Sequence, residues 1–289
     1  MKVLVFPKPE LSTLKVVQDF LRILSKKMNS NIEVALSKFA ESETTGLGLS
    51  RDNDGDLVIV FGGDGTFIRA CRYHPNTPVV GVNTGMFGFL CEFEEDDLEN
   101  LATLLSSSDS PFTLQTVVRL DISTDNTHFE AINDVAISYA SYGKPGVFSI
   151  YVDQKRLYTA KADGVVISTP IGSSAYNLAV GGPLVAHELP VFIISPIAPF
   201  LSFSHPLVVS SFSHVVFVNE DRQHKAGIMI DGNHVLDVAA GEEISIRPSK
   251  QFTHIALFKS KFLTRVHEKI DPGFLNLSVR QRKAKFEFL

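Results

Sequence analysis

Apolar runs alternate with amphipathic stretches over the first third of the chain. Runs at Lys2–Phe6, Ile32–Leu36, Asp56–Phe61 and Pro78–Asn83 predict buried strands, and apolar residues spaced three and four apart over Leu11–Met28 predict an amphipathic helix. Strands that alternate with helices favour a parallel, doubly wound sheet. Such a sheet binds its ligands at the carboxyl ends of the strands.

Beyond a serine-rich boundary at Ser106–Pro111 the apolar period changes to two, which indicates an all-β, β-sandwich-like domain. Only Ser173–Val180 looks helical within it. The pattern therefore predicts an α/β domain over residues 1–108, a β-rich domain over 109–258, and a C-terminal segment over 259–289 that packs back on the first domain. The candidate strands are Thr113–Ile122, Thr127–Tyr139, Val147–Val152, Leu157–Ala160, Val165–Ser168, Val191–Ser195, Leu207–Ser210, His214–Val218, Ala226–Ile230, Val235–Val238, Ile244–Pro248 and His254–Phe258.

Composition narrows the class of protein. The 289 residues are 44% hydrophobic and carry a formal charge of −5, which argues against a nucleic-acid groove. Prolines interrupt the apolar run near Val191, so we expect no membrane span. The two cysteines, Cys71 and Cys91, lie in apolar stretches and predict buried free thiols in a reducing compartment, hence a cytoplasmic protein. The nine histidines show no zinc spacing.

The stretch Gly62-Gly63-Asp64-Gly65-Thr66 follows the most apolar strand and precedes a helical stretch that we expect to begin near Phe67. Glycines let backbone N–H groups approach an anion, and a helix N-terminus favours negative charge, so this turn predicts a phosphate site. Asp64 would be repelled by phosphate unless it holds a metal ion or takes a proton from a hydroxyl. The alternative is an ordinary strand-to-helix turn, in which Gly and Asp are common.

Three further stretches carry candidate chemistry. Asn83–Leu90 is a second glycine turn, whose Phe87 and Phe89 also fit simple core packing. Asn133-Asp134 places an amide beside a carboxylate in a predicted strand, where neighbours point to opposite faces; an Asx pair in a bulge or turn is equally compatible. In Asp163–Tyr176 a strand ends in a turn, and a serine is expected to cap the next helix. Its hydroxyls and aromatic ring suit a nucleotide; the alternative is a capped helix with Tyr176 in the core.

Together these stretches resemble the NAD kinase family. The marks of that family are a GGDGT turn, an N-x-G-x-x-G-F-L segment, an Asn-Glu pair, and a D-G-x-x-x-x-T-P-T-G-S-T-A-Y stretch followed by Gly-Gly-Pro. The match runs in order from about Val58 to Pro183, and Ser195–Pro199 looks like a later proline-containing segment of the family. GGDGT alone also occurs in lipid kinases and phosphofructokinases, so the combination carries the resemblance.

The resemblance implies a Rossmann-like N-terminal domain and a β-rich C-terminal domain. It also implies an enzyme that transfers the γ-phosphoryl group of ATP to the 2′-hydroxyl of the adenosine ribose of NAD. It further implies a divalent metal, with Mg²⁺ expected, and a homo-oligomer, dimer or tetramer. Asp64 corresponds to the residue that orients or deprotonates the hydroxyl. The expected phosphate-binding residues are Gly62, Gly63, Gly65 and Thr66. The expected NAD-binding residues are Asp64, Gly65, Asn83, Asn133, Asp134, Asp163, Thr169, Ser174, Ala175 and Tyr176.

Two positions depart from the family pattern. Asp134 replaces the usual Glu and is one methylene shorter, and Ile171 replaces a Thr, so we assign no polar role to it. Two other functions stay open: a lipid kinase of the diacylglycerol type, which needs an apolar acceptor groove, and a non-catalytic dinucleotide-binding regulator. The sequence also leaves open whether polyphosphate replaces ATP.

Overall fold

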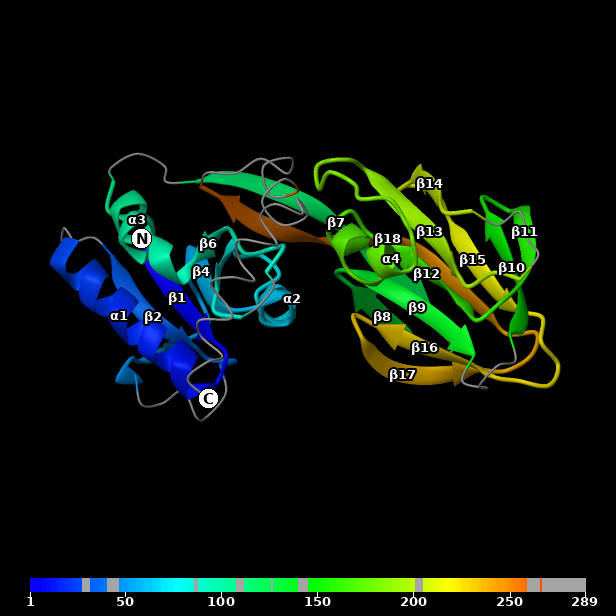
Figure 1. The fold of residues 1–289 in the computed structure, drawn as a ribbon, viewed down its shortest axis with the longest axis horizontal. Coiled ribbons are helices and arrows are strands. Elements are labelled where there is room, and N and C mark those ends of the chain that lie inside the picture. Colours follow the sequence, from blue (N-terminus) through cyan, green and yellow to red (C-terminus); the bar gives the residue numbers. More distant parts are fainter. Residues whose placement is uncertain are drawn as a thin grey trace, which may run out of the picture. The chain divides into compact units, whose positions relative to one another are not determined.

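The chain forms two compact units. The computed structural model describes residues 1–27, 32–40, 47–85, 88–107, 112–125, 127–139, 145–200, 205–258 and 266. The first unit comprises Met1–Phe67, Val79–Leu114 and Ala256–Leu289, and the second comprises Ile68–Pro78 and Gln115–Ile255. Figure 1 labels the elements of both. Within the described ranges, no helix combines the length and the hydropathy that crossing a bilayer requires.

The first unit is a parallel sheet with helices in its connections. Its strand order is β3-β2-β1-β4-β5, and every neighbouring pair is parallel. This order matches the first five positions of the doubly wound order 3-2-1-4-5-6, with the reversal between β1 and β4. The elements are β1 (Lys2–Pro7), α1 (Leu11–Lys27), β2 (Glu33–Ser37), β3 (Arg51–Asp52), β4 (Leu57–Gly62), α2 (Asp64–Tyr73), β5 (Val79–Asn83), β6 (Phe93–Glu94), the 3₁₀ helix η2 (Glu95–Asp97) and α3 (Leu98–Leu105).

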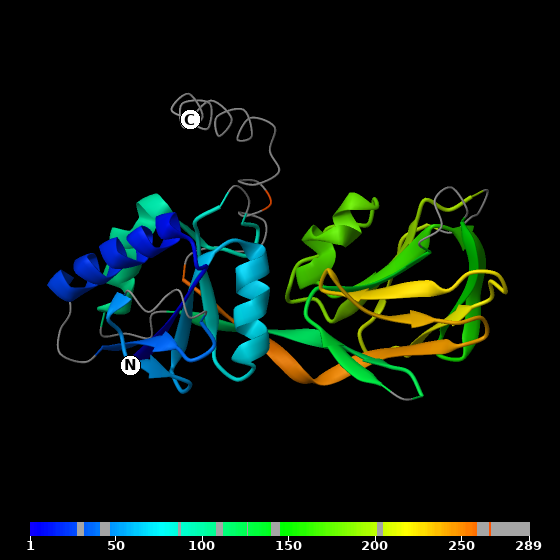
Figure 2. The same cartoon turned by 90° about the horizontal axis from the view of Figure 1, so that it is seen from below.

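The central strands of this sheet are buried on both faces. All residues of β4 and β5 are buried, as the continuous apolar runs predict. Alternate side chains such as Val3, Ile59 and Val82 share one core cluster with Phe20 of α1 and Leu101 of α3. These two helices lie side by side (Figure 2). The described part of the chain therefore confirms the predicted α/β class.

The second unit is a sandwich of antiparallel strands. One sheet has the order β14-β13-β12-β9-β16-β17, and the strands β11-β10-β15-β18 run side by side in the other, where β7 pairs with β18 and β8. The elements are β7 (Thr113–Ser123), β8 (His128–Ala131), β9 (Asp134–Tyr139), β10 (Gly146–Val152), β11 (Lys155–Ala162), β12 (Gly164–Ser168), the 3₁₀ helix η3 (Ile171–Ser174), α4 (Tyr176–Ala179), β13 (Val191–Ile197), β14 (Leu207–Ser210), β15 (Val215–Asn219), β16 (Ala226–Ile230), β17 (Asn233–Val238) and β18 (Glu243–Leu257).

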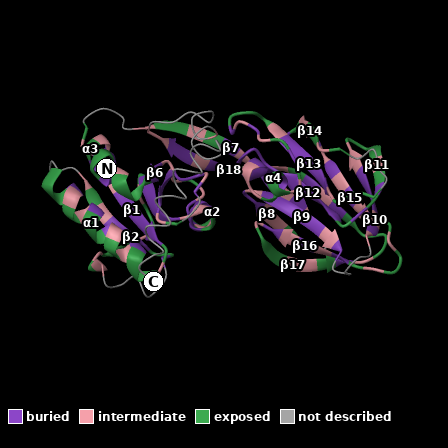
Figure 3. Ribbon diagram, viewed as in Figure 1, coloured by how far each residue is buried: buried purple, intermediate pink, exposed green. Residues whose placement is uncertain are grey.

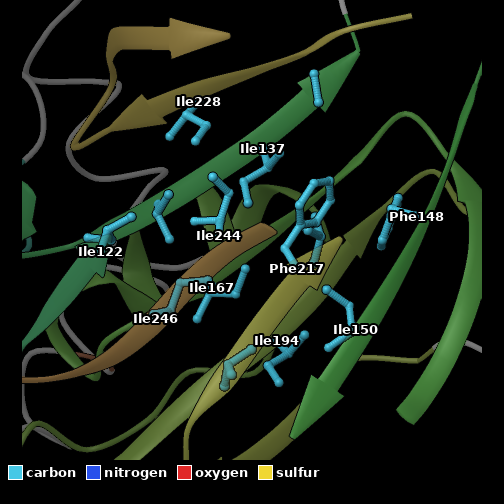
Figure 4. Packing of buried hydrophobic residues seen from close by; sticks show 14 of the residues in the cluster. Ile122, Ile137, Phe148, Ile150, Ile167, Ile194, Phe217, Ile228, Ile244 and Ile246 are labelled. Carbon is cyan, nitrogen blue, oxygen red and sulfur yellow. The ribbon is translucent and has the colours of Figure 1, made fainter. Parts of the chain in front are cut away.

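A single apolar cluster fills the space between these sheets and confirms the β-rich class. Figure 3 shows the central strands buried, and Figure 4 shows inward side chains of both sheets meeting. One sheet contributes Ile137, Ile167, Ile194 and Ile228, and the other contributes Ile150, Phe217, Ile244 and Ile246. The alternation of inward and outward residues is the period of two seen in the sequence.

Three predicted elements differ in the structure. The stretch 41–54 is polar and contains glycine, a composition that predicts a loop, but it contains β3, which pairs with β2 through Leu36 and Arg51. The strand predicted over Thr127–Tyr139 is two strands, because the chain bends at Ile132 and Asn133. The two strands predicted at the C-terminal end are one, β18. Its ladder with β15 ends at Ile246, so the proline that follows removes no bond from that ladder.

The helix after the glycine turn begins at Asp64, three residues before the predicted start. The segment predicted over 259–289 lies outside the described residues except for Val266, and so does part of the predicted boundary at Ser106–Pro111.

Phe217→Ala tests the sandwich core. The Phe217 side chain is fully buried and stacks on Phe148 with ring centroids 5.3 Å apart. We expect the free energy of unfolding to fall by about 3–5 kcal/mol in urea titrations, because truncation leaves a cavity. The control is Phe212→Ala, whose ring is 81% exposed and whose loss is expected to change stability by less than about 0.5 kcal/mol. Equal losses in the two variants would contradict this packing.

Candidate functional site

The glycine turn joins β4 to α2 and leaves backbone donors unpaired. Gly62 ends the strand, and the residues from Asp64 to Thr66 form the first turn of the helix. The N–H groups of Thr66 and Phe67 donate to the Gly63 carbonyl at 3.0 and 3.1 Å. Among the described residues, the N–H groups of Gly63 and Gly65 have no acceptor. Unpaired donors at a helix N-terminus favour an anion.

Two glycines of this turn are required for different reasons. A Cβ at Gly62 would lie 2.6 Å from Oγ1 of Thr66, so a side chain there would displace this buried threonine. A hypothetical Cβ at Gly65 has no atom within 4 Å. Gly62 therefore permits close packing within the turn, whereas the space beside Gly65 is open to an approaching ligand.

The Asp64 carboxylate is held by the second glycine stretch. Oδ2 accepts a hydrogen bond from the N–H of Phe89, and Oδ1 accepts one from the N–H of Leu90, both at 2.9 Å. These bonds bring together residues that are 25 and 26 positions apart in the sequence. They therefore fix the orientation of the carboxylate.

Asn83 ends β5 beside Gly62, its partner in the β4–β5 ladder. Its Nδ2 donates to Oε2 of Glu94 at 2.9 Å, and its Oδ1 accepts from the Gly85 N–H at 3.2 Å. The side chain is only 4% exposed. The Asn83 side chain thus links the end of β5 to Gly85 and Glu94. A contact between this side chain and a ligand stays a prediction. Glu94 received no role from the sequence, and positions 86 and 87 lie outside the described residues.

In the second unit, Asn133 and Asp134 lie at a corner of the chain between β8 and β9. Asn133 belongs to a bend and not to a ladder, which is the turn alternative weighed from the sequence. The N–H of Thr169 donates to the Asn133 carbonyl at 2.8 Å, and its hydroxyl donates to the Ile132 carbonyl at 2.6 Å. A Cβ at Gly172 would lie 2.1 Å from the Asn133 carbonyl oxygen. The stretch after β12 therefore packs directly on this corner.

The corner carries two side-chain groups that lack partners among the described residues. Oδ1 of Asn133 is buried and accepts no hydrogen bond. The carboxyl group of Asp134, in a residue 4% exposed, makes none either. Burial raises the pKa of Asp134 to about 7, and the negative charge of Asp231 adds to the rise. Unpaired buried polar atoms are costly, so both groups are candidates for contact with a ligand.

Asp231, which the sequence analysis did not select, accepts hydrogen bonds from backbone N–H groups of this corner. Its side chain is 2% exposed and pairs with Arg72 at 2.9 Å. An available signal was the Asp231-Gly232 dipeptide between two apolar runs, which predicts a tight hairpin. That signal locates the turn but does not identify the corner as its partner.

The predicted serine cap in the stretch from Ser173 to Tyr176 was wrong. The N-cap of α4 is Ala175, and neither serine caps a helix. The Ser173 hydroxyl donates to the Pro170 carbonyl at 2.7 Å, and that of Ser174 donates to the Ile171 carbonyl at 3.3 Å. The chain folds into a 3₁₀ turn at this point, so the hydroxyls find carbonyl groups close by. The ring of Tyr176 is 37% exposed, which favours the interpretation that it is available to a ligand over core packing.

Asn177 was also missed, although it anchors this stretch. Its Nδ2 donates to the carbonyl groups of Ser173 and Pro183, both at 3.0 Å, and its Oδ1 accepts from the Ser195 hydroxyl at 2.7 Å. A Cβ at Gly182 would lie 1.9 Å from Oδ1 of Asn177. Gly182, in the Gly-Gly-Pro sequence that ends the stretch, is thus required for this side chain to fit.

Asp163 lies apart from these residues. It precedes β12 and Thr169 follows it, so an extended strand separates the two by about 20 Å. Asp163 is exposed, whereas Thr169 is fully buried with its hydroxyl bonded internally. The second unit therefore gathers Asn133, Thr169 and Gly172 but leaves Asp163 at the other end of the strand.

Family comparisons match most of the chain. Residues 10–109 match the ATP-NAD kinase N-terminal domain family, and residues 132–257 match the ATP-NAD kinase C-terminal domain family. The chain is 30% identical to the NAD kinase of Methanosarcina acetivorans over 269 residues, which cover 91% of this chain and 95% of that protein. It is 31% identical to the NAD kinase of Chlorobium phaeobacteroides over 202 residues, which cover 69% of this chain and 71% of that protein.

Solved structures show the same fold. An NAD kinase from Archaeoglobus fulgidus in complex with ATP matches with a TM-score of 0.71 and 26% identity, covering 93% of this chain and 98% of that one. Yeast NADH kinase complexed with NADH matches with a TM-score of 0.79 and 21% identity, covering 93% and 87%.

Asp134→Asn tests the buried carboxyl. Because the folded-state pKa is raised from 3.8 to about 7, the contribution of Asp134 to stability is fully present below the unfolded pKa and is lost as the pH rises through about 7. We expect Asp134→Asn to gain stability relative to wild type by up to about 4 kcal/mol between about pH 4 and about pH 8, measured by urea unfolding. The exposed Asp163→Asn is the control, and a pH-independent difference for Asp134→Asn would contradict the burial.

Proposed function

The chain belongs to the NAD kinase family, and we propose which of its residues carry out the ATP-dependent phosphorylation of NAD. The enzyme is a phosphotransferase. The acceptor in this proposal is the 2′-hydroxyl of the adenosine ribose. The 2′-oxygen forms a bond to the γ-phosphorus of ATP, the bond from that phosphorus to the bridging oxygen breaks, and NADP and ADP leave with the hydroxyl proton released.

Asp64 orients the 2′-hydroxyl or takes its proton. The observation that carries this role is the carboxylate at the first position of α2, fixed in orientation by the N–H groups of Phe89 and Leu90. A fixed acceptor aligns the hydroxyl for in-line attack, which is the main requirement of phosphoryl transfer. A proton acceptor at the same place contributes general-base catalysis.

The glycine turn binds phosphate groups in this proposal. The unpaired N–H groups of Gly63 and Gly65 and the open space beside Gly65 support the role. Gly62 acts by allowing the turn to close on Thr66, whose hydroxyl is buried beside it. Backbone donors suit charge that spreads over the transferring oxygens.

The second unit supplies most of the NAD contacts. Oδ1 of Asn133 and the carboxyl group of Asp134 have no partner among the described residues and form hydrogen bonds with the dinucleotide. The exposed ring of Tyr176 offers a surface on which a ring of the dinucleotide stacks. Thr169 acts through the corner that it holds. The remaining NAD contacts in this proposal are Asp64, Gly65, Asn83, Asp163, Ser174 and Ala175. Asp163, at the other end of β12, contacts a different part of an extended dinucleotide.

A divalent metal, Mg²⁺, accompanies ATP in this proposal. Among the described residues, no group of three or more His, Cys, Asp or Glu side chains is placed to hold a metal ion. Mg²⁺ fits such a donor set when substrate phosphates and water supply most of its ligands, with one carboxylate such as Asp64 nearby. When bound, the metal neutralises phosphate charge, while Asp64 and the glycine turn hold the reacting groups.

We further propose a cytoplasmic homo-oligomer, a dimer or tetramer. The buried free thiols of Cys71 and Cys91 support a reducing compartment. The oligomer rests on the family resemblance and is checked by light scattering coupled to gel filtration.

The decisive assay incubates the protein with ATP, Mg²⁺ and NAD and detects NADP. Matches to both domain families favour this activity over a lipid kinase or a non-catalytic regulator. Diacylglycerol replaces NAD in a parallel reaction, and polyphosphate replaces ATP in another. Absence of NADP with either donor would overturn the proposed function.

Asp64→Asn should lower kcat by about 10²-fold or more, because the amide cannot take a proton and orients the hydroxyl less well. The variant should stay folded with a modestly lower unfolding temperature, since the amide oxygen still accepts one N–H hydrogen bond while the amide N–H₂ faces the other N–H donor. The measurement is steady-state formation of NADP. Asp54→Asn, which changes an exposed carboxylate of the same unit, serves as the control and should keep wild-type turnover. Near-normal kcat in Asp64→Asn would remove this residue from the mechanism.

A further inference from the structure

We propose that Asp231 is a positioning residue for NAD, which acts by holding the backbone of Ile132, Asn133 and Asp134 in the shape that presents their ligand-binding groups. The inference rests on the proposed NAD contacts of Asn133 and Asp134. It adds a residue that lies almost a hundred positions further along the chain and that acts through the backbone of those contacts.

Both oxygens of the Asp231 carboxylate are occupied. Oδ1 accepts hydrogen bonds from the N–H groups of Asn133 at 2.7 Å, Ile132 at 3.1 Å and Asp134 at 3.3 Å. Oδ2 lies 3.1 Å from the Ile132 N–H and 2.9 Å from a guanidinium nitrogen of Arg72. A charged acceptor makes stronger hydrogen bonds than a neutral one, so this side chain dominates the local backbone geometry.

The backbone N–H and carbonyl groups of the corner have different hydrogen-bond partners. Its N–H groups donate to Asp231, whereas its carbonyl groups at Ile132 and Asn133 accept from Thr169. The two residues that bend belong to no ladder, so no neighbouring strand fixes them. Without the carboxylate, buried N–H groups would lose their acceptor, and the bend would rearrange to find water or another partner.

The hairpin that carries Asp231 is itself rigid. Ile230 pairs with Asn233 across a two-residue turn in which Asp231 and Gly232 have φ of 47° and 81°. Two positive φ values define the tight turn that Asn-Gly, Asp-Gly and Gly-Gly favour. The backbone N–H of Asp231 also donates to the Asp134 carbonyl at 3.1 Å. The main chain and the side chain of Asp231 therefore both form hydrogen bonds with the same corner.

This turn determines which variants test the idea. Asp231→Gly removes the carboxylate and keeps a residue that adopts positive φ freely. Asp231→Asn keeps the shape and the turn preference but loses the charge and places an amide N–H₂ toward donors. Arg72→Gln removes the ion pair alone. Asp237→Asn changes an exposed carboxylate on the same hairpin, 2.9 Å from His234, and is the matched control.

The experiment measures KM for NAD, KM for ATP and kcat in each variant, and amide hydrogen exchange at Asn133. For Asp231→Gly we expect KM for NAD to rise about tenfold or more, with KM for ATP and kcat changed less than about threefold. We expect exchange at the Asn133 amide to quicken by about tenfold or more. Asp231→Asn should give a smaller rise in KM for NAD, and Asp237→Asn should match wild type.

Asn133→Ala, measured in parallel, separates this inference from the proposed function. If Asn133→Ala raises KM for NAD and Asp231→Gly does not, the positioning role is wrong and the proposed NAD contact stands. If neither variant changes KM for NAD, both are wrong. An equal rise in Arg72→Gln and Asp231→Gly would assign the effect to the ion pair and overturn the role through the backbone. If Asp231→Gly does not fold, Asp231→Asn replaces it: a rise in KM for NAD with faster exchange at the Asn133 amide supports the positioning role, and no rise overturns it.

Discussion

A buried or half-buried carboxylate that accepts backbone N–H groups from a distant segment is the interaction on which this structure depends. At the proposed site it is made once in each unit. Asp64 accepts from Phe89 and Leu90, and Asp231 accepts from the bend at Ile132 and Asn133. In each case the carboxylate fixes a loop that no ladder could fix, because the N–H groups that donate to it belong to irregular backbone. Both loops carry residues of the proposed site.

The same demand for paired backbone groups explains the glycines. Gly172 and Gly182 lie where a Cβ would meet the Asn133 carbonyl and the Asn177 side chain at about 2 Å or less. Close backbone contact of this kind lets hydrogen bonds form between segments without water. Gly63 and Gly65 differ, since their N–H groups have no acceptor among the described residues and bind phosphate only in the proposed function. The glycines of the family motifs thus form two groups: some allow two segments to pack closely, and others have backbone N–H groups that are available to a ligand in the proposed function.

Local features of the fold were predictable from the sequence, and long-range partners were not. Apolar periodicity located the strand before Gly62 and the helix over Leu11–Lys27, because each depends on neighbouring residues. The family motifs predicted Asp64 and Asn133 as site residues. Asp231 could not be predicted, because its role depends on contacts 97 to 99 positions away. The serines were assigned as caps, but a 3₁₀ turn gave their hydroxyls nearer carbonyl acceptors.

Strand β18 contributes residues to both apolar cores, which affects how the chain folds as it leaves the ribosome. Ile244 and Ile246 belong to the sandwich core, and Ala256 belongs to the core under the parallel sheet. Neither core is complete until this strand has been translated, although most of each unit precedes it in the sequence. Until then, strand edges and apolar faces remain uncovered in the nascent chain, which is where chaperones bind and where aggregation begins.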